Sequence, residues 1–312
     1  MKTAVLLALP LLLVGCAATP APVESPSAFT ADNCGFEVTV ASPPERIVTI
    51  KSTSTELVLA LGLGDKIVGQ AFPDGPVPAS LPQVDVPVIS DFAPSEEAVL
   101  ELEPDLVFGG WESNFTADTA GDRAELRDLG IASYVSPAAC KGENQPTYLS
   151  FDELFGYIAE AGDLLGASDE AATLIASQKA ELDAIEKDDR GNTALWWSSG
   201  TDTPYVGAGI GAPQMIMNEI GLTNIAGDVA DTWTSFNWEA VIAANPDVIV
   251  LVDASWNTAE SKREYLASNP ATANLDAVIN QRYLVVPFAA GEAGVRSVEA
   301  ATSLSGQLAK LK

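Results

Sequence analysis

The sequence predicts an α/β protein of two lobes, each with a central parallel sheet, joined by a long helical connector. Short apolar runs alternate with helix-like segments along both halves of the 312 residues, a rhythm typical of parallel sheets. Residues 97–108 are echoed by residues 239–250, which indicates two lobes of one design. Between the halves, residues 151–187 carry apolar side chains at helical spacing.

In the first half, strands and helices follow one another in regular order. Residues 36–40 alternate as a half-buried strand does, and Gly62 and Gly64 end the first helix. The proline of each echo stops a helix just before the next strand begins. We expect strands at residues 36–40, 47–50, 67–69, 87–89, 106–108 and 132–135, and helices at residues 55–61, from 96, and at 122–129.

The connector and the second half complete this plan. Gly162 and Gly166 are expected to divide the connector into two helices, with Ser168 as the N-cap of the second. A strand at residues 194–197 opens the second lobe. The expected organisation is a signal peptide at residues 1–15, a lipidated cysteine and flexible tether at 16–33, an N-terminal lobe at 34–150, a helical connector at 151–190 and a C-terminal lobe at 191–312.

Composition and charge exclude several classes of protein. The chain has 16 Lys and Arg against 43 Asp and Glu, a net charge of −27, so it lacks the basic face that nucleic-acid phosphates need. It contains no histidine, which removes Ser-His-Asp and Cys-His catalysis and imidazole zinc sites. We therefore expect a protein that is not an enzyme and that uses no cofactor and no metal.

The N-terminus is typical of an export signal. Lys2 precedes an apolar run at residues 4–14 that is too short to span a bilayer, which needs ~20 residues. The end of this run, residues 13–16, resembles a bacterial lipobox, and this resemblance implies lipidation of Cys16. The alternative is an ordinary signal peptide with a chance cysteine. We expect an exported protein, lipid-anchored on the outer face of the cytoplasmic membrane, with Pro-rich residues after Cys16 as its tether.

Two cysteines remain once Cys16 is set aside. Export places Cys34 and Cys140 in an oxidising compartment, where a disulfide is the default state. Two buried free thiols are the alternative. A catalytic thiol is not expected, because no histidine is present to activate it.

Several segments of the chain carry a resemblance to a known family. Residues 46–50, 55–57 and 61–69, with the two Pro-Asp strand starts and the inter-lobe helix, resemble the solute-binding lipoproteins of iron-siderophore and cobalamin ABC importers. The resemblance covers residues 36–310 and implies two Rossmann-like lobes in the helical-backbone periplasmic-binding-protein fold. It also implies a monomer that grips a small molecule between its lobes and delivers it to a permease dimer. The chain departs from the family in having no histidine for the cleft and Lys51 after the first strand, where many relatives have Pro or Ser.

A narrower resemblance bears on the ligand. Residues 51–56, 110–114, 136–141 and 205–217 resemble an actinobacterial subgroup assigned to a deazaflavin importer, which carries the coenzyme F-420 precursor. This favours a flat anionic organic ligand, and a ferric siderophore or cobalamin is the alternative within the family. From another class, an extracellular carboxylate-dependent hydrolase would use an acidic pair that includes Asp231 or Glu239, but 43 carboxylates form pairs by chance. Duplicated lobes argue against an adhesin or structural lipoprotein.

The candidate ligand-binding residues follow from the carboxyl ends of the predicted strands, where open α/β lobes bind ligands. A cation and helix-end hydroxyls suit an anion, glycines let main-chain N–H groups approach, and aromatic rings stack flat ligands. The alternatives are a surface lysine beside an N-cap, a cleft-edge turn, core-filling tryptophans and an ordinary salt bridge. The predicted residues are Lys51, Ser52, Thr53, Trp111, Glu112, Trp197, Ser198, Tyr205, Gly209, Gly211, Trp233, Trp256 and Arg296.

Two glutamates are candidates for docking to the permease. Glu97 and Glu239 each lie seven residues before the proline of the echo, in the first turn of a helix after the expected N-caps Ser95 and Asn237. In the resembled binders, one glutamate per lobe meets an arginine on each permease subunit, and the matching positions here are these two. The alternative is a favourable contact between each carboxylate and its helix dipole.

Overall fold

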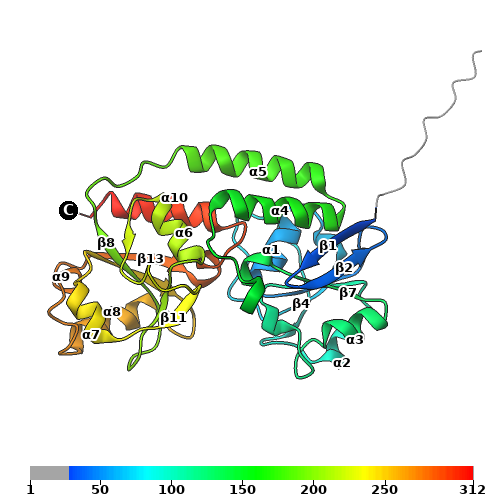
Figure 1. The fold of residues 1–312 in the computed structure, drawn as a ribbon, viewed down its shortest axis with the longest axis horizontal. Coiled ribbons are helices and arrows are strands. Elements are labelled where there is room, and N and C mark those ends of the chain that lie inside the picture. The colour runs from blue at the N-terminus through cyan, green and yellow to red at the C-terminus, as the bar shows by residue number, and fades with distance from the viewer. Residues whose placement is uncertain (1–27, 312) are drawn as a thin grey trace, which may run out of the picture.

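The computed structural model describes residues 28–311, so the predicted signal peptide and Cys16 lie outside the described residues. Two α/β lobes lie side by side, and helices α4 (Phe151–Leu165) and α5 (Ser168–Asp183) run along one side of the molecule (Figure 1). The predicted fold class is confirmed, with one correction to the second sheet that is given below.

The N-terminal lobe is built on a five-stranded sheet in the order β5-β4-β3-β6-β7, and every neighbouring pair is parallel. The central strand β3 is buried along its whole length, as expected for an apolar run covered on both faces. The strands are β3 (Ile47–Ile50), β4 (Ile67–Ala71), β5 (Val88–Ser90), β6 (Leu106–Gly109) and β7 (Ala132–Val135). The helices are α1 (Ser52–Ala60), α2 (Glu96–Leu100) and α3 (Arg123–Asp128), with 3-10 turns at Gly64–Lys66, Glu112–Asn114, Pro137–Ala139 and Gly142–Asn144.

A hairpin covers the outer edge of this sheet. Strand β1 (Phe29–Asn33) pairs antiparallel with β2 (Phe36–Val40), so residues 29–33 are part of the lobe and not of the tether in which the sequence analysis placed them. The side chain of Asn33 holds the hairpin to β7, because its amide donates to Val135 O at 2.8 Å and accepts from Val135 N at 2.8 Å. Arg123 also donates to Asn33 O at 2.7 Å.

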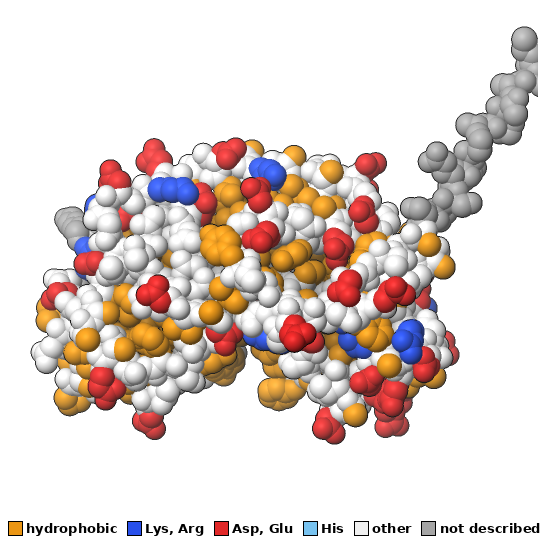
Figure 2. Space-filling model, in the orientation of Figure 1, with side chains coloured by type: hydrophobic (Ala, Val, Ile, Leu, Met, Phe, Trp, Pro, Cys, Tyr) orange, Lys and Arg blue, Asp and Glu red, His pale blue; other side chains and the backbone are white. Residues whose placement is uncertain are grey.

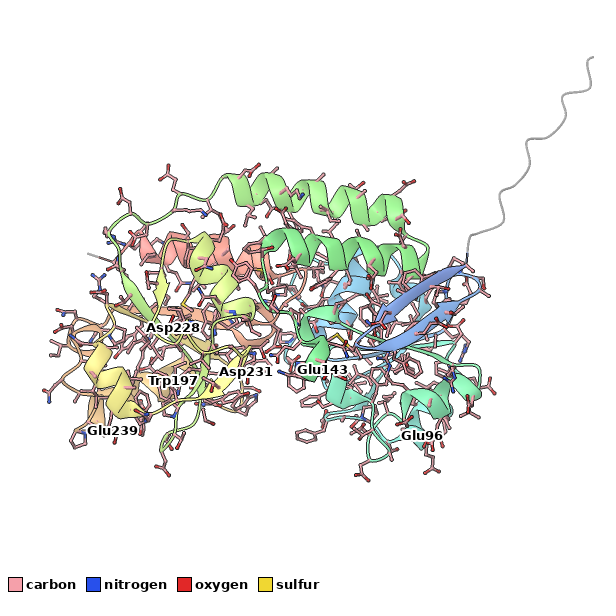
Figure 3. The ribbon with its side chains drawn as sticks, in the orientation of Figure 1. Glu96, Glu143, Trp197, Asp228, Asp231 and Glu239 are labelled. Carbon is pink, nitrogen blue, oxygen red and sulfur yellow. A yellow bond between two sulfur atoms is a disulfide. The ribbon has the colours of Figure 1, made fainter. Side chains whose placement is uncertain are left out.

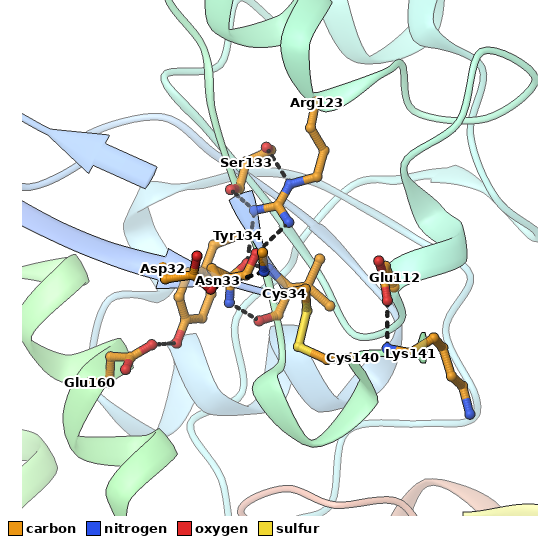
Figure 4. The surroundings of a disulfide bond; sticks show 12 residues. Asp32, Asn33, Cys34, Glu112, Arg123, Ser133, Tyr134, Cys140, Lys141 and Glu160 are labelled. Atoms are coloured by element: carbon orange, nitrogen blue, oxygen red, sulfur yellow. Dashed lines mark hydrogen bonds between the residues drawn. A yellow bond between two sulfur atoms is a disulfide. The ribbon is translucent and has the colours of Figure 1, made fainter. Parts of the chain in front are cut away.

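The predicted disulfide between Cys34 and Cys140 is present and joins the hairpin to the loop after β7. Figure 4 shows that the next residue, Lys141, donates its main-chain N–H to the carboxylate of Glu112, at 2.6 Å. The disulfide therefore fixes the loop whose main chain donates a hydrogen bond to Glu112.

The C-terminal lobe has a six-stranded mixed sheet, whereas the sequence predicts a parallel one. Its order is β11-β9-β8-β12-β13, with β10 paired to β8. Strands β8, β10, β12 and β13 are mutually parallel, but β9 runs antiparallel to both of its neighbours, β8 and β11, because the chain reverses direction through residues 200–204. The strands are β8 (Thr193–Ser199), β9 (Tyr205–Gly207), β10 (Thr223–Asn224), β11 (Trp233–Ser235), β12 (Val248–Asp253) and β13 (Tyr283–Pro287). The helices are α6 (Ala212–Glu219), α7 (Trp238–Ala244), α8 (Ala259–Ser268), α9 (Asp276–Ile279) and α10 (Ser297–Leu308), with a 3-10 turn at Phe288–Gly291.

The connector joins the two lobes through a shared core. Ser150 and Glu153 form a capping box at the start of α4, and Gly166, with φ of 68°, ends it. The N-cap of α5 is Ala167 and not the predicted Ser168, because the new helix begins almost directly after Gly166. Ser168 is the first residue of α5, and its hydroxyl donates to Asp163 Oδ1 at 2.6 Å. One hydrophobic cluster contains residues of β3, α4, β8 and α10, so the connector is packed into both lobes.

Acidic side chains are spread over both lobes in the view of Figure 2, in keeping with the net charge. No helix within residues 28–311 is long and apolar enough to cross a membrane. The same residues contain no cluster of acidic or cysteine side chains arranged to hold a metal ion.

Candidate functional site

A pocket of about 300 Å³ lies between the lobes and is lined by residues of both. The N-terminal lobe contributes the ends of β3, β6 and β7, and the C-terminal lobe contributes β8, β9, β11 and the turn after β13. Figure 3 labels Asp231 and Glu143, which lie on the two sides of this junction. The lining residues are Thr53, Gly110, Trp111, Glu112, Ser113, Ser136, Ala138, Ala139, Lys141, Ser198, Tyr205, Gly211, Ala212, Thr232, Trp233, Phe288, Glu292 and Ala293.

Aromatic rings form much of the pocket wall. Tyr205 on β9 and Trp233 on β11 belong to the antiparallel edge of the second sheet, and their rings stack with centroids 6.1 Å apart and planes 14° apart. Trp111 faces them from the other lobe, and Phe288 lies in the turn after β13. Such rings suit a flat apolar ligand, since each stacked pair contributes ~0.5–1.5 kcal/mol beyond area burial.

Lys51 lies behind this wall and not in it. Its side chain is 1% exposed and forms an ion pair with Asp74. Its Nζ lies 3.9 Å from the ring centroid of Phe72, 3.7 Å from that of Trp111 and 5.3 Å from that of Phe288. Burial lowers the pKa of Lys51, and the charge of Asp74 opposes this effect.

Asp74 also occupies the helix end at which the sequence predicts an anionic ligand. Ser52 donates its main-chain N–H to Asp74 Oδ2 at 3.2 Å, and Asp74 N donates to the Ser52 hydroxyl at 2.8 Å. Helix α1 therefore begins three residues before the predicted residue 55, after Lys51, which has φ of 81° and ψ of 149°. The protein's own carboxylate fills the predicted anion position.

Polar contacts tie the two lobes together around the pocket. The indole N–H of Trp111 donates to Glu292 Oε2 at 3.2 Å. Lys141 Nζ donates to Thr232 Oγ1 at 3.0 Å and lies 3.8 Å from Asp231 Oδ1. Farther from the pocket, Arg296 forms an ion pair with Glu56 at 3.3 Å. Burial raises the pKa of Glu56 to about 7, although Arg296 acts in the opposite direction.

The structure brings seven of the predicted ligand-binding residues to the pocket wall and places six elsewhere. Those on the wall are Thr53, Trp111, Glu112, Ser198, Tyr205, Gly211 and Trp233. Lys51, Ser52 and Arg296 are held in the internal pairs described above, so a direct contact between any of them and a ligand stays a prediction.

The other three predicted residues have structural explanations. Trp197 is buried and donates its indole N–H to Ser199 O at 2.7 Å. Gly209 packs so tightly that a Cβ atom there would lie 2.1 Å from Gly227 O, and its N–H donates to Val229 O at 2.9 Å. Trp256 is 63% exposed, and its ring lies against that of Phe288, with centroids 5.9 Å apart.

Four important residues were not among the predicted site residues. Asp74, Lys141, Thr232 and Glu292 all lie in loops or turns without periodic pattern. Of these four, only Glu292 could have been proposed from the sequence, because it follows the carboxyl end of the last predicted strand, where such lobes bind ligands.

Helix α6 begins at the pocket. Gly211 and Ala212 line the pocket, and Pro213 falls in the first turn of the helix, a position that suits proline. A Cβ atom at Gly211 would lie 3.0 Å from Thr232 O, which explains why a glycine is suited to this tight junction.

Comparisons with known proteins place this geometry in context. Residues 47–290 match the family model described as "Periplasmic binding protein". An uncharacterised ABC transporter substrate-binding lipoprotein of Bacillus subtilis is 29% identical over 282 residues, covering 88% of this chain and 83% of that protein. A cobalamin-binding protein of Halobacterium salinarum is 28% identical over 73% of this chain, which spans 58% of that protein. The solved structure of an ABC-type Fe3+-hydroxamate transport system from Saccharomonospora viridis superposes with a TM-score of 0.75 at 26% identity, covering 89% of this chain and 98% of that one.

Proposed function

Because the chain belongs to the periplasmic binding protein family, we propose that it is the extracytoplasmic solute-binding lipoprotein of an ABC importer. It captures a small organic molecule between its lobes and delivers it to a permease dimer. The likeness to a substrate-binding lipoprotein over 88% of the chain supports this role. The proposed anchor is a lipid on Cys16, followed by a tether that ends at β1, and the proposed solution state is a monomer.

The observation that carries the proposal is the inter-lobe pocket with its aromatic wall. Trp111, Tyr205, Trp233 and Phe288 surround a space lined from both lobes, so a bound solute would touch both lobes at once. Pockets of this size and character hold small organic ligands. The proposed solute is a flat ring system, and the coenzyme F-420 precursor is the candidate favoured by the sequence resemblance.

Cobalamin or a ferric siderophore is the second candidate. The likeness to a cobalamin-binding protein and to a structure from an Fe3+-hydroxamate transport system supports it. These solutes are bulkier than a single flat ring system, and the pocket measures about 300 Å³, so lobe opening would be needed to admit either.

Glu97 and Glu239 are the proposed contacts with the permease. Both are exposed, and Ser95 and Asn237 cap their helices as predicted by accepting from Ala98 N and Ala240 N. In Figure 3, Glu239 and Glu96, the neighbour of Glu97, lie on the side of the molecule away from α4 and α5. One glutamate on each lobe would give a two-point contact.

Co-purification of a solute tests the proposed ligand. The mature chain, expressed in its native host and released from the membrane, is expected to carry a small molecule identified by absorbance and mass. A yellow, fluorescent species indicates a deazaflavin, and a red-brown or pink species indicates iron or cobalamin. Trp233→Ala is expected to weaken binding about tenfold through loss of stacking and burial. Trp256→Ala, outside the wall, is the matched control, and equal losses in both variants would contradict the assigned pocket.

A further inference from the structure

Every cation near the pocket already has an anionic partner within the protein. Lys51 is paired with Asp74, and Arg296 is paired with Glu56. Among the described lining residues, Lys141 is the one lysine, and it lies 3.8 Å from Asp231 and donates to Thr232. An anionic solute therefore meets no unpaired positive side chain among the described lining residues.

Two carboxylates on the pocket wall, in contrast, have only uncharged hydrogen-bond partners among residues 28–311. Glu112 Oε2 accepts from the main-chain N–H of Lys141 at 2.6 Å, and Glu292 Oε2 accepts from the indole N–H of Trp111 at 3.2 Å. Neither forms an ion pair within residues 28–311, and over the same range the second oxygen of each, Oε1, accepts no hydrogen bond. One carboxylate comes from each lobe, so both would act on a solute held between the lobes.

The surroundings of these carboxylates make their free oxygens significant. Both side chains are half-buried beside aromatic rings. A carboxylate oxygen that loses water there and has no donor in the protein is unfavourable, and a hydrogen bond from a ligand would compensate for the lost hydration. Burial raises the pKa of Glu292, and the charge of Lys51 opposes this effect. A second anion here would be repelled by two carboxylates. A cation beside Glu292 would meet Lys51, whose ammonium lies 3.7 Å from the ring centroid of Trp111.

We infer that the solute is a flat aromatic molecule whose polar substituents are uncharged hydrogen-bond donors, such as the hydroxyls of a polyol chain, and that Glu112 and Glu292 select it. This inference rests on the proposed solute-binding function and replaces the expectation that the solute is recognised by its negative charge. The rings hold the flat part, and the two Oε1 atoms accept from the donors. An anionic substituent is disfavoured next to either carboxylate.

Three probes separate ring, donor and charge. Riboflavin has a flat ring and a ribityl chain of hydroxyls, FMN adds a terminal phosphate to that chain, and lumichrome has the ring without the chain. Fluorescence titration of the mature chain with its disulfide intact is expected to show riboflavin binding at least about tenfold more tightly than FMN and lumichrome, which corresponds to one charge-assisted hydrogen bond.

Charge-removing variants then test the two carboxylates. Glu112→Gln and Glu292→Gln are each expected to weaken riboflavin about tenfold and to narrow the gap between riboflavin and FMN. Glu143→Gln is the matched control, because Glu143 is exposed, lies near the junction of the lobes in Figure 3 and is not among the residues of the pocket wall. Thermal melting of each variant checks that it is folded.

The outcomes distinguish this inference from the proposed function. FMN binding as tightly as riboflavin, or unchanged affinities in both variants, would overturn the role of the carboxylates while leaving solute binding in place. If none of the three probes binds, the flat donor-bearing solute is wrong. In that case a co-purified cobalamin or siderophore would still support the transport role.

Discussion

The central strands of the two lobes begin in the same way, but the residues that follow their carboxyl ends differ. Before β6 and before β12, a residue in the left-handed region precedes the proline: Glu103 with φ of 44° and Asn245 with φ of 42°. The aspartate after each proline then caps the neighbouring strand. Asp105 accepts from Arg46 N at 3.0 Å, and Asp247 accepts from Thr193 N at 2.8 Å. The sequence echo is therefore a structural repeat.

At the carboxyl ends the lobes diverge. Strand β3 pairs with β6, and β8 pairs with β12, in equivalent registers, so that Lys51 and Ser198 follow equivalent residues, Ile50 and Trp197. Ser198 lines the pocket, whereas Lys51 is closed off by Asp74 and aromatic rings. The starts of these strands therefore form a framework common to both lobes, and their opposite ends differ and line the pocket.

The largest expected effect concerns the docking residues, where the lobes should be alike. The double variant Glu97→Ala, Glu239→Ala is expected to abolish uptake, because both proposed contacts with the permease are lost, while solute affinity stays unchanged. Each single variant should retain part of the uptake. Cellular uptake and titration of the purified protein measure the two quantities.

A matched double variant serves as the control for this experiment. Glu101→Ala with Glu264→Ala removes the same charge from exposed positions of the two lobes. Equal uptake in the two double variants would show that Glu97 and Glu239 are ordinary helix-end residues.

The second effect is specific to the end of β3. Asp74→Ala leaves the Lys51 ammonium buried without its carboxylate and is expected to lower the free energy of unfolding by about 3–5 kcal/mol. Replacing both partners, as in Lys51→Met with Asp74→Asn, should restore much of this loss. Denaturant unfolding measures both, with Asp85→Ala at an exposed site as control. A loss below 1 kcal/mol for Asp74→Ala would contradict the buried pair.

The third effect concerns the disulfide, which lies in the N-terminal lobe and therefore distinguishes it from the C-terminal lobe. Cys34→Ser with Cys140→Ser opens a covalent link across 106 residues and is expected to cost about 2–4 kcal/mol. Because the bridge supports Lys141 and hence Glu112, solute affinity should also fall. Reduction of the native protein must reproduce the loss, and two free thiols in the oxidised protein would exclude the bond.

The smallest effect tests the shared strand starts. Asp105→Ala and Asp247→Ala are each expected to cost about 1 kcal/mol, because both carboxylates are exposed and their hydrogen bonds are partly replaced by water. Hydrogen bonds from Thr193 lower the pKa of Asp247. Its contribution is therefore complete above the unfolded-state pKa and is lost as the pH falls through the folded-state value. Asp247→Asn should flatten that acid limb in pH-dependent unfolding, and an unchanged limb would contradict the role of this carboxylate.

The framework was predictable because its signals are local. A proline, an aspartate and the apolar run that follows determine where β6 and β12 begin, and Ser95 and Asn237 cap the preceding helices as expected. The strands β9 and β11 were not predicted, because a strand of three residues is too short to show an alternation of apolar and polar side chains. The hairpin strand β1 was missed because its partner, β2, determines it more than its own sequence does.

The site was only partly predictable, for a different reason. Residues at strand ends, such as Thr53, Trp111 and Ser198, reach the pocket because the fold brings those ends together. The pairing of Lys51 with Asp74 depends on a loop 23 residues away, which no periodic pattern describes. Charge counted along the sequence does not show which cations are paired in space, and both Lys51 and Arg296 lie in internal ion pairs.

The shared hydrophobic cluster has a consequence for how the molecule melts. Side chains of β3, α4, β8 and α10 belong to one hydrophobic cluster, so unfolding of either lobe would expose part of a core that it shares with the other. We therefore expect the two lobes to unfold as one cooperative unit, with a single calorimetric transition. A solute bound in the cleft is then expected to raise the melting temperature of both lobes. Thermal melting, followed in either lobe, would report whether the cleft holds a solute.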